Sequence, residues 1–208
     1  FFIDRNLVET IEKEGIKQVI FSRDGLRVLL ICFNGIYSYD AWGNERWAYN
    51  TEEDIHSAVF SKSASLLAVS EGKNLLVLDK EGAIVWREKS DNFIGGVVFS
   101  DSQKILVGMN KGISCFNSSG KKLWATHTGN LVLGIATSEK NTIAISGKEL
   151  IFINNDGELI WKVKVGPFRS LSIAHDGGIM VATDTSVRRF TQTGKEVWHV
   201  GGDEFVET

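Results

Sequence analysis

Short runs of apolar residues, separated by turns rich in glycine, asparagine and aspartate, fill the chain from end to end. Runs of this length bounded by such turns are typical of β-strands. Asn34-Gly35 is the strongest short hairpin signal among the turns. The first complete unit predicts four strands, at 16–22, 26–33 and 36–40 and then a fourth strand that carries Trp47.

Later units repeat this plan, with third strands expected at 75–79, 113–117, 150–154 and 187–191. These strands are apolar at nearly every position, as in Leu75-Leu76-Val77-Leu78, which indicates burial on both faces of a sheet. The first strands instead carry small residues, at Ser57-Ala58, Gly95-Gly96, Gly134 and Ser170. Small side chains suit strands that crowd around a central axis.

Two markers recur once per unit. A glycine precedes a tryptophan by four residues, in the pairs Gly43/Trp47, Gly82/Trp86, Gly120/Trp124, Gly157/Trp161 and Gly194/Trp198. The tryptophans are 39, 38, 37 and 37 residues apart. A serine ends the first strand at Ser22, Ser61, Ser100 and Ser138, with His175 in the fifth position. We expect each glycine to close a hairpin at positive φ, and each tryptophan to cover the gap between neighbouring sheets from an outer strand.

This period in a β-rich chain predicts an all-β fold, a β-propeller of four-stranded antiparallel blades. We expect one domain over 1–208, with five whole blades at 15–50, 51–89, 90–127, 128–164 and 165–200. Residues 1–14 are predicted as a partial blade, and 201–208 as the start of a further one. Because the sequence begins inside an expected strand, we interpret it as a segment of a longer chain.

The glycine-to-tryptophan element, the serine after the first strand and the turns Asp24-Gly25 and Asp176-Gly177 resemble propellers of the pyrroloquinoline-quinone-like repeat type. These are relatives of the WD-repeat propellers. The resemblance covers the whole chain and implies the architecture. It does not select an activity, because the group includes quinone-dependent dehydrogenases, an outer-membrane assembly lipoprotein and many sensor or scaffold domains.

Composition narrows the class of partner. Hydrophobic residues make up 43% and charged residues 24%, and no apolar run approaches the roughly 20 residues that span a bilayer. The net charge of -3 gives no polyelectrolyte surface for nucleic acid.

Cys32 and Cys115 fall at apolar strand positions, which favours free buried thiols over a disulfide. Free thiols in turn favour a reducing, cytoplasmic compartment.

No catalytic, cofactor or metal motif stands out. The four histidines, His56, His127, His175 and His199, lack metal-ligand spacing. The segment 154–158 resembles the start of a calcium loop but occupies a hairpin turn found in every unit, and Glu52-Glu53-Asp54 is interpreted as a solvated acidic loop rather than a cation site. No residues match the calcium site and catalytic aspartate that a quinone-dependent dehydrogenase would require. We therefore expect no cofactor.

Departures from the repeat are candidates for function. Trp42 occupies a turn position that is held elsewhere by Glu81, Ser119, Asp156 and Thr193. Phe33 occupies one held by Gly72, Asn110, Gly147 and Asp184. Exposed aromatics favour a protein contact, although single apolar residues on a surface are common. We expect these two at opposite ends of the blade, so that they cannot form one patch.

The fifth unit departs most. Arg169 is assigned to the position of Ile16, Ile55, Ile94 and Val132, and His175 to that of serine. Arg188-Arg189 replaces Leu76-Val77 and Ile151-Phe152. Because buried arginine needs a partner, the three arginines predict a seam or a partner contact. The ring is then incomplete, or is closed by the terminal segment and the hairpin at 1–11; the alternative is an interblade salt bridge in a closed five-bladed ring.

These features predict a non-enzymatic scaffold that meets a protein or peptide. The alternative is a ligand-binding, sensor or quinone-dependent enzymatic domain that uses the channel mouth, with its catalytic parts outside this segment. The sequence leaves the oligomeric state open.

Overall fold

The computed structural model describes residues 13–51, 53–91, 93–100, 103–138 and 141–201. In these residues the chain forms twenty strands and no helix, so no helix long and apolar enough to cross a membrane is present there. The strands make five antiparallel sheets of four, each built from strands that follow one another in the chain. The expected all-β fold with five four-stranded sheets is confirmed.

The sheets are numbered here as blades 1 to 5. Blade 1 contains β1 (Ile16–Phe21), β2 (Arg27–Cys32), β3 (Gly35–Asp40) and β4 (Glu45–Asn50), and blade 2 contains β5 (Ile55–Phe60), β6 (Leu66–Glu71), β7 (Asn74–Asp79) and β8 (Ile84–Lys89). Blade 3 contains β9 (Ile94–Phe99), β10 (Ile105–Met109), β11 (Gly112–Phe116) and β12 (Lys122–His127). Blade 4 contains β13 (Val132–Thr137), β14 (Asn141–Ser146), β15 (Glu149–Asn154) and β16 (Leu159–Lys164). Blade 5 contains β17 (Phe168–Ile173), β18 (Ile179–Thr183), β19 (Ser186–Phe190) and β20 (Glu196–Gly201).

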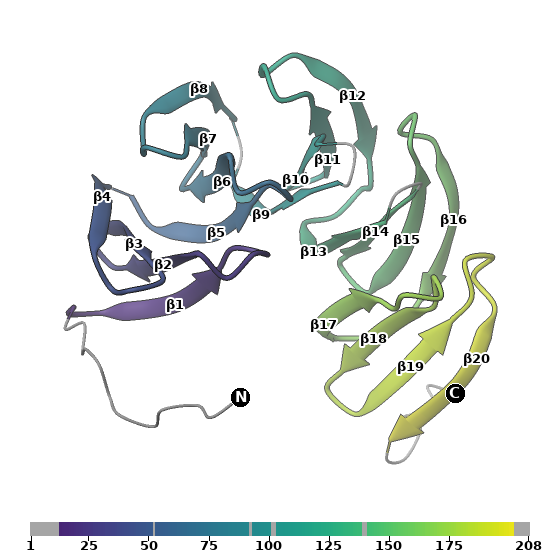
Figure 1. Ribbon diagram of the computed structural model, residues 1–208. Coiled ribbons are helices and arrows are strands. Elements are labelled where there is room, and N and C mark those ends of the chain that lie inside the picture. The colour runs from purple at the N-terminus through teal and green to yellow at the C-terminus, as the bar shows by residue number, and fades with distance from the viewer. Residues whose placement is uncertain (1–12, 52, 92, 101–102, 139–140, 202–208) are drawn as a thin grey trace.

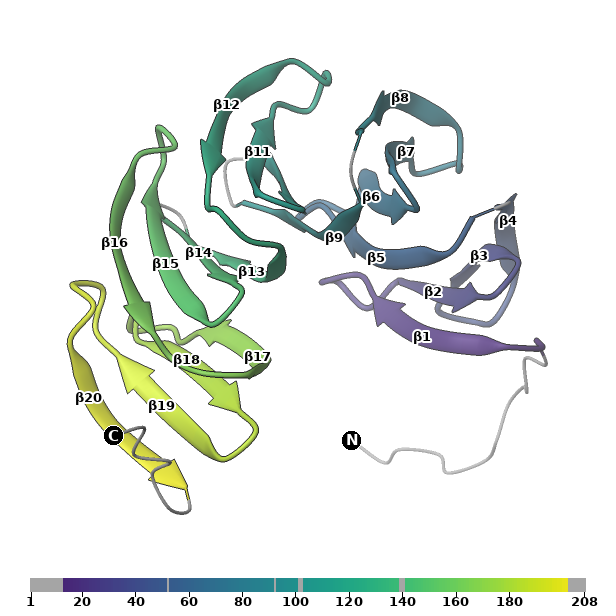
Figure 2. The same ribbon diagram turned by 180° about the vertical axis from the view of Figure 1, so that it is seen from behind.

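The blades follow one another around an arc, with the first strand of each blade innermost and the fourth outermost (Figure 1). Both views show blade 1 and blade 5 on opposite sides of an opening (Figure 2). The described residues therefore form an open arc of five blades and not the closed five-bladed ring of the alternative. The expected partial blades fall largely on 1–12 and 202–208, outside the described residues.

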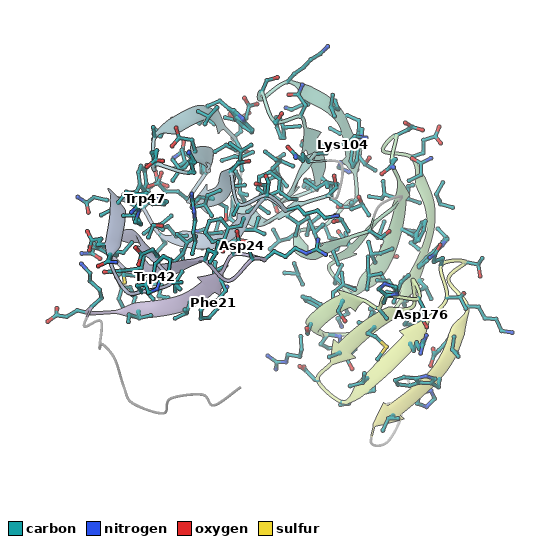
Figure 3. All side chains as sticks on the ribbon, viewed as in Figure 1. Phe21, Asp24, Trp42, Trp47, Lys104 and Asp176 are labelled. Carbon is teal, nitrogen blue, oxygen red and sulfur yellow. The ribbon has the colours of Figure 1, made fainter. Side chains whose placement is uncertain are left out.

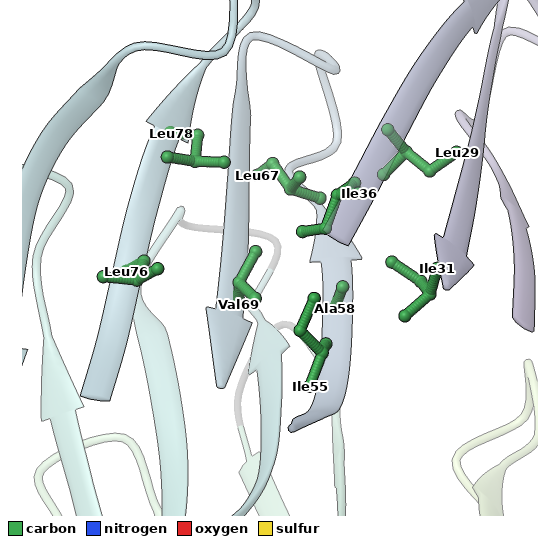
Figure 4. Close-up of a cluster of buried hydrophobic side chains, with 9 residues drawn as sticks. All are labelled: Leu29, Ile31, Ile36, Ile55, Ala58, Leu67, Val69, Leu76 and Leu78. Atoms are coloured by element: carbon green, nitrogen blue, oxygen red, sulfur yellow. The ribbon is translucent and has the colours of Figure 1, made fainter. Parts of the chain in front are cut away.

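The core lies between the blades rather than within one sheet. Residues of the third strand β7 divide between its two sides: Leu76 and Leu78 join the cluster with blade 1, and Leu75 and Val77 join the cluster with blade 3. Figure 4 shows the first of these clusters between the two sheets. The continuous apolar third strands are thus buried on both faces, as their sequence predicts.

A turn follows each third strand. A polar side chain at the end of the strand, or directly after it, holds this turn in place. The Asp79 Oδ1 accepts hydrogen bonds from the backbone N–H groups of Glu81 and Ala83, both at 2.9 Å. Asp40, Asn117 and Asn154 make the same pair of bonds in their own turns. This is the Asx turn, which asparagine and aspartate favour.

The recurring tryptophans join each blade to the next. The Trp47 indole N–H donates to the Lys80 carbonyl at 3.0 Å, and its ring lies against Gly82, whose φ is 83°. A side chain at this glycine would meet the ring at 2.7 Å, so both its conformation and this approach require glycine. Three further tryptophans repeat both contacts one blade further on: Trp86 with Ser118 and Gly120, Trp124 with Asn155 and Gly157, and Trp161 with Gln192 and Gly194. Trp47, Trp86, Trp124 and Trp161 thus each contact the turn of the following blade, as a structural role would require.

The register of blade 5 corrects one expectation. Phe168, not Arg169, pairs at the start of the first strand as Ile55 does in blade 2. Ala174, not His175, follows that strand and closes the turn. The expected alignment of blade 5 used the spacing of the tryptophans, and Trp198 follows Trp161 by 37 residues. The first strand starts 36 residues after that of blade 4, at Phe168 instead of Arg169, so the alignment was wrong by one position.

Candidate functional site

A β-bulge lies at the second residue of every first strand. In β1, Ile16 and Gln18 pair with consecutive residues of β2, so that Lys17 has no cross-strand partner. The bulged residues of the five blades are Lys17, His56, Gly95, Leu133 and Arg169. All but the glycine are exposed. A bulge redirects the side chain that it leaves unpaired, so each innermost strand presents one variable residue at the same end of the arc.

This end also carries the hairpin turns between second and third strands and the connections between blades; we call it the connection end. Phe33 lies in such a turn, with its backbone N–H bonded to the Gly15 carbonyl at 3.2 Å. The Lys17 Nζ lies 4.4 Å from the centre of the Phe33 ring and 2.8 Å from the Asp54 Oδ1. In the connection from blade 1 to blade 2, Asp54 directly precedes β5.

The same row continues onto blade 3. The His56 and Phe93 rings have their centres 4.4 Å apart and are tilted by 56°. Phe33 and Phe93 are 68% and 42% exposed, so both present large apolar area to solvent. We call Phe33, Lys17, Asp54, His56 and Phe93 the aromatic row. The repeat pattern predicts Phe33 as an exposed aromatic but predicts neither Phe93 nor these contacts. The residue after each position equivalent to Ile16 differs from blade to blade, and this variation is the signal of the bulge.

The charges of the row largely cancel. The Lys17 ammonium, by hydrogen bond and by charge, holds the pKa of Asp54 below its usual value of 3.8, and His56 adds to this effect. The aromatic row is therefore a mainly apolar surface that contains an ion pair, rather than a charged one.

Trp42 lies away from this row. It is 74% exposed and belongs to the turn between β3 and β4, whereas Phe33 belongs to the turn before β3. The expected placement of the two aromatics at opposite ends of the blade is confirmed. Figure 3 shows Trp42 on blade 1.

The three arginines of blade 5 occupy three different surroundings. Arg169 pairs with Asp184 at the connection end. Arg188 pairs with Glu196 and donates to the Lys164 carbonyl at 3.3 Å, beside blade 4.

Arg189 pairs with Asp176 on the other face of blade 5. The register confirms that Arg188 and Arg189 occupy the positions of Ile151 and Phe152. Glu196 and Asp176 both belong to blade 5, so neither pair is the interblade salt bridge of the alternative interpretation.

Two further groups bear on cofactor chemistry. Among the residues that the structure describes, no three His, Cys, Asp or Glu side chains gather closely enough to hold a metal ion. Cys32 and Cys115 are free and buried, and burial raises the pKa of the Cys115 thiol to about 11. The 154–158 segment is an ordinary hairpin turn.

Comparisons with known proteins agree with this architecture. The chain superposes on the β-propeller domain of Cps50 (Swd1) from Myceliophteria thermophila with a TM-score of 0.76 at 14% identity, covering 89% of this chain and 68% of that one. It superposes on BamB from Moraxella catarrhalis with a TM-score of 0.66 at 16% identity, covering 88% of this chain and 63% of that one. The chain thus spans about two thirds of each of these propellers. A search of curated proteins by sequence finds no match.

One family model matches in two overlapping segments, residues 32–131 and 109–205. Together the segments cover most of the chain, including all five recurring glycine and tryptophan pairs. The protein therefore belongs to the family described as outer membrane protein assembly factor BamB, with the pyrroloquinoline-quinone-like and WD-repeat-like propeller architecture that its sequence resembles.

Proposed function

We propose that this propeller is a non-enzymatic interaction scaffold that binds a protein or peptide through the aromatic row at the connection end. The observation that carries the proposal is the pair of exposed rings, Phe33 and Phe93, together with the Lys17–Asp54 ion pair that lies beside Phe33. Exposed aromatic groups that desolvate on contact supply much of the affinity of protein interfaces.

Packing between the blades holds the aromatic row in a fixed arrangement. The row takes residues from blades 1, 2 and 3, and the Trp47 and Trp86 contacts hold these blades together. A surface fixed in this way loses little conformational entropy when a partner binds, which favours affinity.

The test uses a photo-crosslinking amino acid at Phe93, with the same group at Trp42 as the control on the opposite end. A protein captured at Phe93 alone would be purified and its Kd measured. The double variant Phe33→Ala, Phe93→Ala should then weaken binding at least about tenfold, because loss of aromatic anchors commonly costs more than 1 kcal/mol. Trp42→Ala should leave the Kd unchanged.

Capture at Trp42 only, or an unchanged Kd for the double variant, would contradict the proposal. All three side chains are exposed, so neither variant should alter folding. Circular dichroism and the unfolding midpoint check this directly.

A further inference from the structure

The fourth strand is the outermost strand of each blade (Figure 1). In β4, β8, β12 and β16 the first, second, fourth and sixth residues are exposed, and the third and fifth are half-buried. The third residue is the recurring tryptophan, which makes the contact with the next blade. Packing between blades therefore leaves the exposed positions free to vary. We call the exposed side chains of β8, β12 and β16, on three neighbouring blades, the outer rim.

Large aliphatic side chains are frequent on the outer rim. They are between 42% and 53% exposed and comprise Ile84, Val85, Leu123, Leu159 and Ile160. The corresponding strand of blade 1 exposes Glu45, Arg46, Ala48 and Asn50. The fold thus does not require apolar residues at these positions. Single apolar residues on a surface are common, but a group repeated on neighbouring blades indicates a contact surface.

Basic side chains fill most of the remaining positions of the outer rim. They are Arg87, Lys89, Lys122, Lys162 and Lys164. The three strands, all of whose residues the structure describes, contain one acid, Glu88, which is half-buried with its Oε1 3.6 Å from the Lys122 Nζ. Five basic residues and one acid give these strands a net charge of +4, whereas the whole chain has -3.

Acidic residues next to the outer rim limit its extent. Glu81 lies in the turn before β8, and Asp156 and Glu158 lie in the turn before β16. Glu149 on the neighbouring strand β15 has its Oε1 3.2 Å from the Lys162 Nζ. The basic surface is therefore confined to the outer strands and does not continue onto the turns.

We propose that the outer rim binds the surface of an anionic lipid bilayer. The aliphatic side chains enter the boundary between headgroups and acyl chains, and the lysine and arginine side chains reach the lipid phosphates. Such binding gains free energy from buried apolar area and from the attraction between basic residues and anionic lipids. The long basic side chains extend their charges to a flat surface from a curved rim.

Composition favours a bilayer over a protein at this surface. Protein interfaces are enriched in aromatic residues and depleted in lysine. The outer rim has four lysines, and all of its positions are described and hold no phenylalanine, tyrosine or tryptophan. The aromatic row, at the connection end, has the opposite character. The inference therefore does not rest on the proposed function of that row.

The first test places a fluorescent label on the outer rim. Ala125 on β12 and Ala48 on β4 are both exposed and occupy the same position of the fourth strand. A cysteine at either position accepts an environment-sensitive fluorophore, because Cys32 and Cys115 are buried. With vesicles of phosphatidylglycerol and phosphatidylcholine, we expect a blue shift of the emission at Ala125→Cys and none at Ala48→Cys.

Paired substitutions then separate the two contributions. Leu123→Ser with Ile160→Ser removes apolar area, and Lys162→Gln with Lys164→Gln removes two charges. Each pair should weaken partition onto these vesicles at least about fivefold in a flotation assay. The control pair Arg46→Gln with Lys148→Gln removes two exposed charges outside the outer rim. It should change partition less than about twofold, because salt screens distant charges.

Three results would overturn the proposal. The first is that the wild-type protein does not float with these vesicles, or floats equally with phosphatidylcholine alone. The second is a blue shift at Ala48→Cys but not at Ala125→Cys. The third is binding of duplex DNA or polyglutamate together with unchanged flotation of the Leu123→Ser, Ile160→Ser variant, which would assign the outer rim to an acidic macromolecule. All substituted side chains are exposed, and circular dichroism checks that each variant folds.

Discussion

The indole nitrogen of Trp86 lies 2.9 Å from the carbonyl oxygen of Ser118, which belongs to the hairpin turn of the next blade. One side chain thus supplies both apolar cover and a directed hydrogen bond across the gap between two sheets. Because this contact recurs at four successive interfaces, it sets the spacing of the blades and the orientation of the surface that they carry.

Trp86 and Trp198 occupy the same repeat position, but loss of the Trp86 ring should lower the free energy of unfolding far more. Trp86→Ala should lower the free energy of unfolding by about 3 to 5 kcal/mol, the usual cost of truncating a large packed aromatic. Trp198→Ala and Trp42→Ala should each cost about 1 kcal/mol or less, because both rings are exposed. Denaturant midpoints measure the losses, and equal losses for the three variants would refute the structural role of Trp86.

Substitution of Gly157, which lies under a tryptophan ring, should destabilise the fold more than substitution of Gly25, a glycine of similar φ. Gly157 and Gly25 have φ of 87° and 71°, so alanine strains the backbone at both. At Gly157 the new Cβ also meets Trp124 at 2.6 Å, whereas nothing lies within 4 Å at Gly25. We expect Gly157→Ala to lose at least about 1 kcal/mol more stability than Gly25→Ala, as overpacking does. Similar unfolding midpoints for the two variants would show that the ring contact is unimportant.

The two cysteines should be unreactive in the folded protein. Burial raises the pKa of both thiols, that of Cys115 to about 11. Since the thiolate is the reactive form, little of it is present at pH 8. A thiol reagent should label the native protein slowly and label two thiols rapidly after denaturation. Rapid labelling of Cys115 under native conditions would contradict its placement in the core.

The Arg188–Glu196 pair predicts a pH dependence on the acid side. Arg188 holds the pKa of Glu196 below its usual value of 4.5, so the pair stabilises the fold above that pH. This contribution is lost as the pH falls through the lower pKa of the folded protein. Arg188→Met should therefore cost at most about 1 kcal/mol at pH 7, and the difference from the wild type should shrink below about pH 4.5. A difference that stays constant down to pH 3 would assign the loss to packing rather than to charge.

The period of glycine and tryptophan was sufficient to predict the fold, because each marker serves a contact that every interface needs. It could not predict the register of blade 5, where the connection before Phe168 is shorter than the tryptophan spacing implies. The aromatic row was also hidden, because a bulge at His56 and a connection between blades bring its ring to Phe93. Such contacts depend on how two sheets are placed relative to each other. The repeat in the sequence does not specify this placement.

The most direct test of the account is the distance between the Trp198 indole nitrogen and the Ala41 carbonyl oxygen in a crystal structure. Ala41 precedes Gly43 by two residues, as Ser118 precedes Gly120, so it would accept this bond if blade 5 met blade 1. The account predicts that the two atoms lie far outside hydrogen-bond range while the four preceding tryptophan contacts are present. A separation within about 3.2 Å, the limit of an ordinary hydrogen bond, would show a closed five-bladed ring and contradict it.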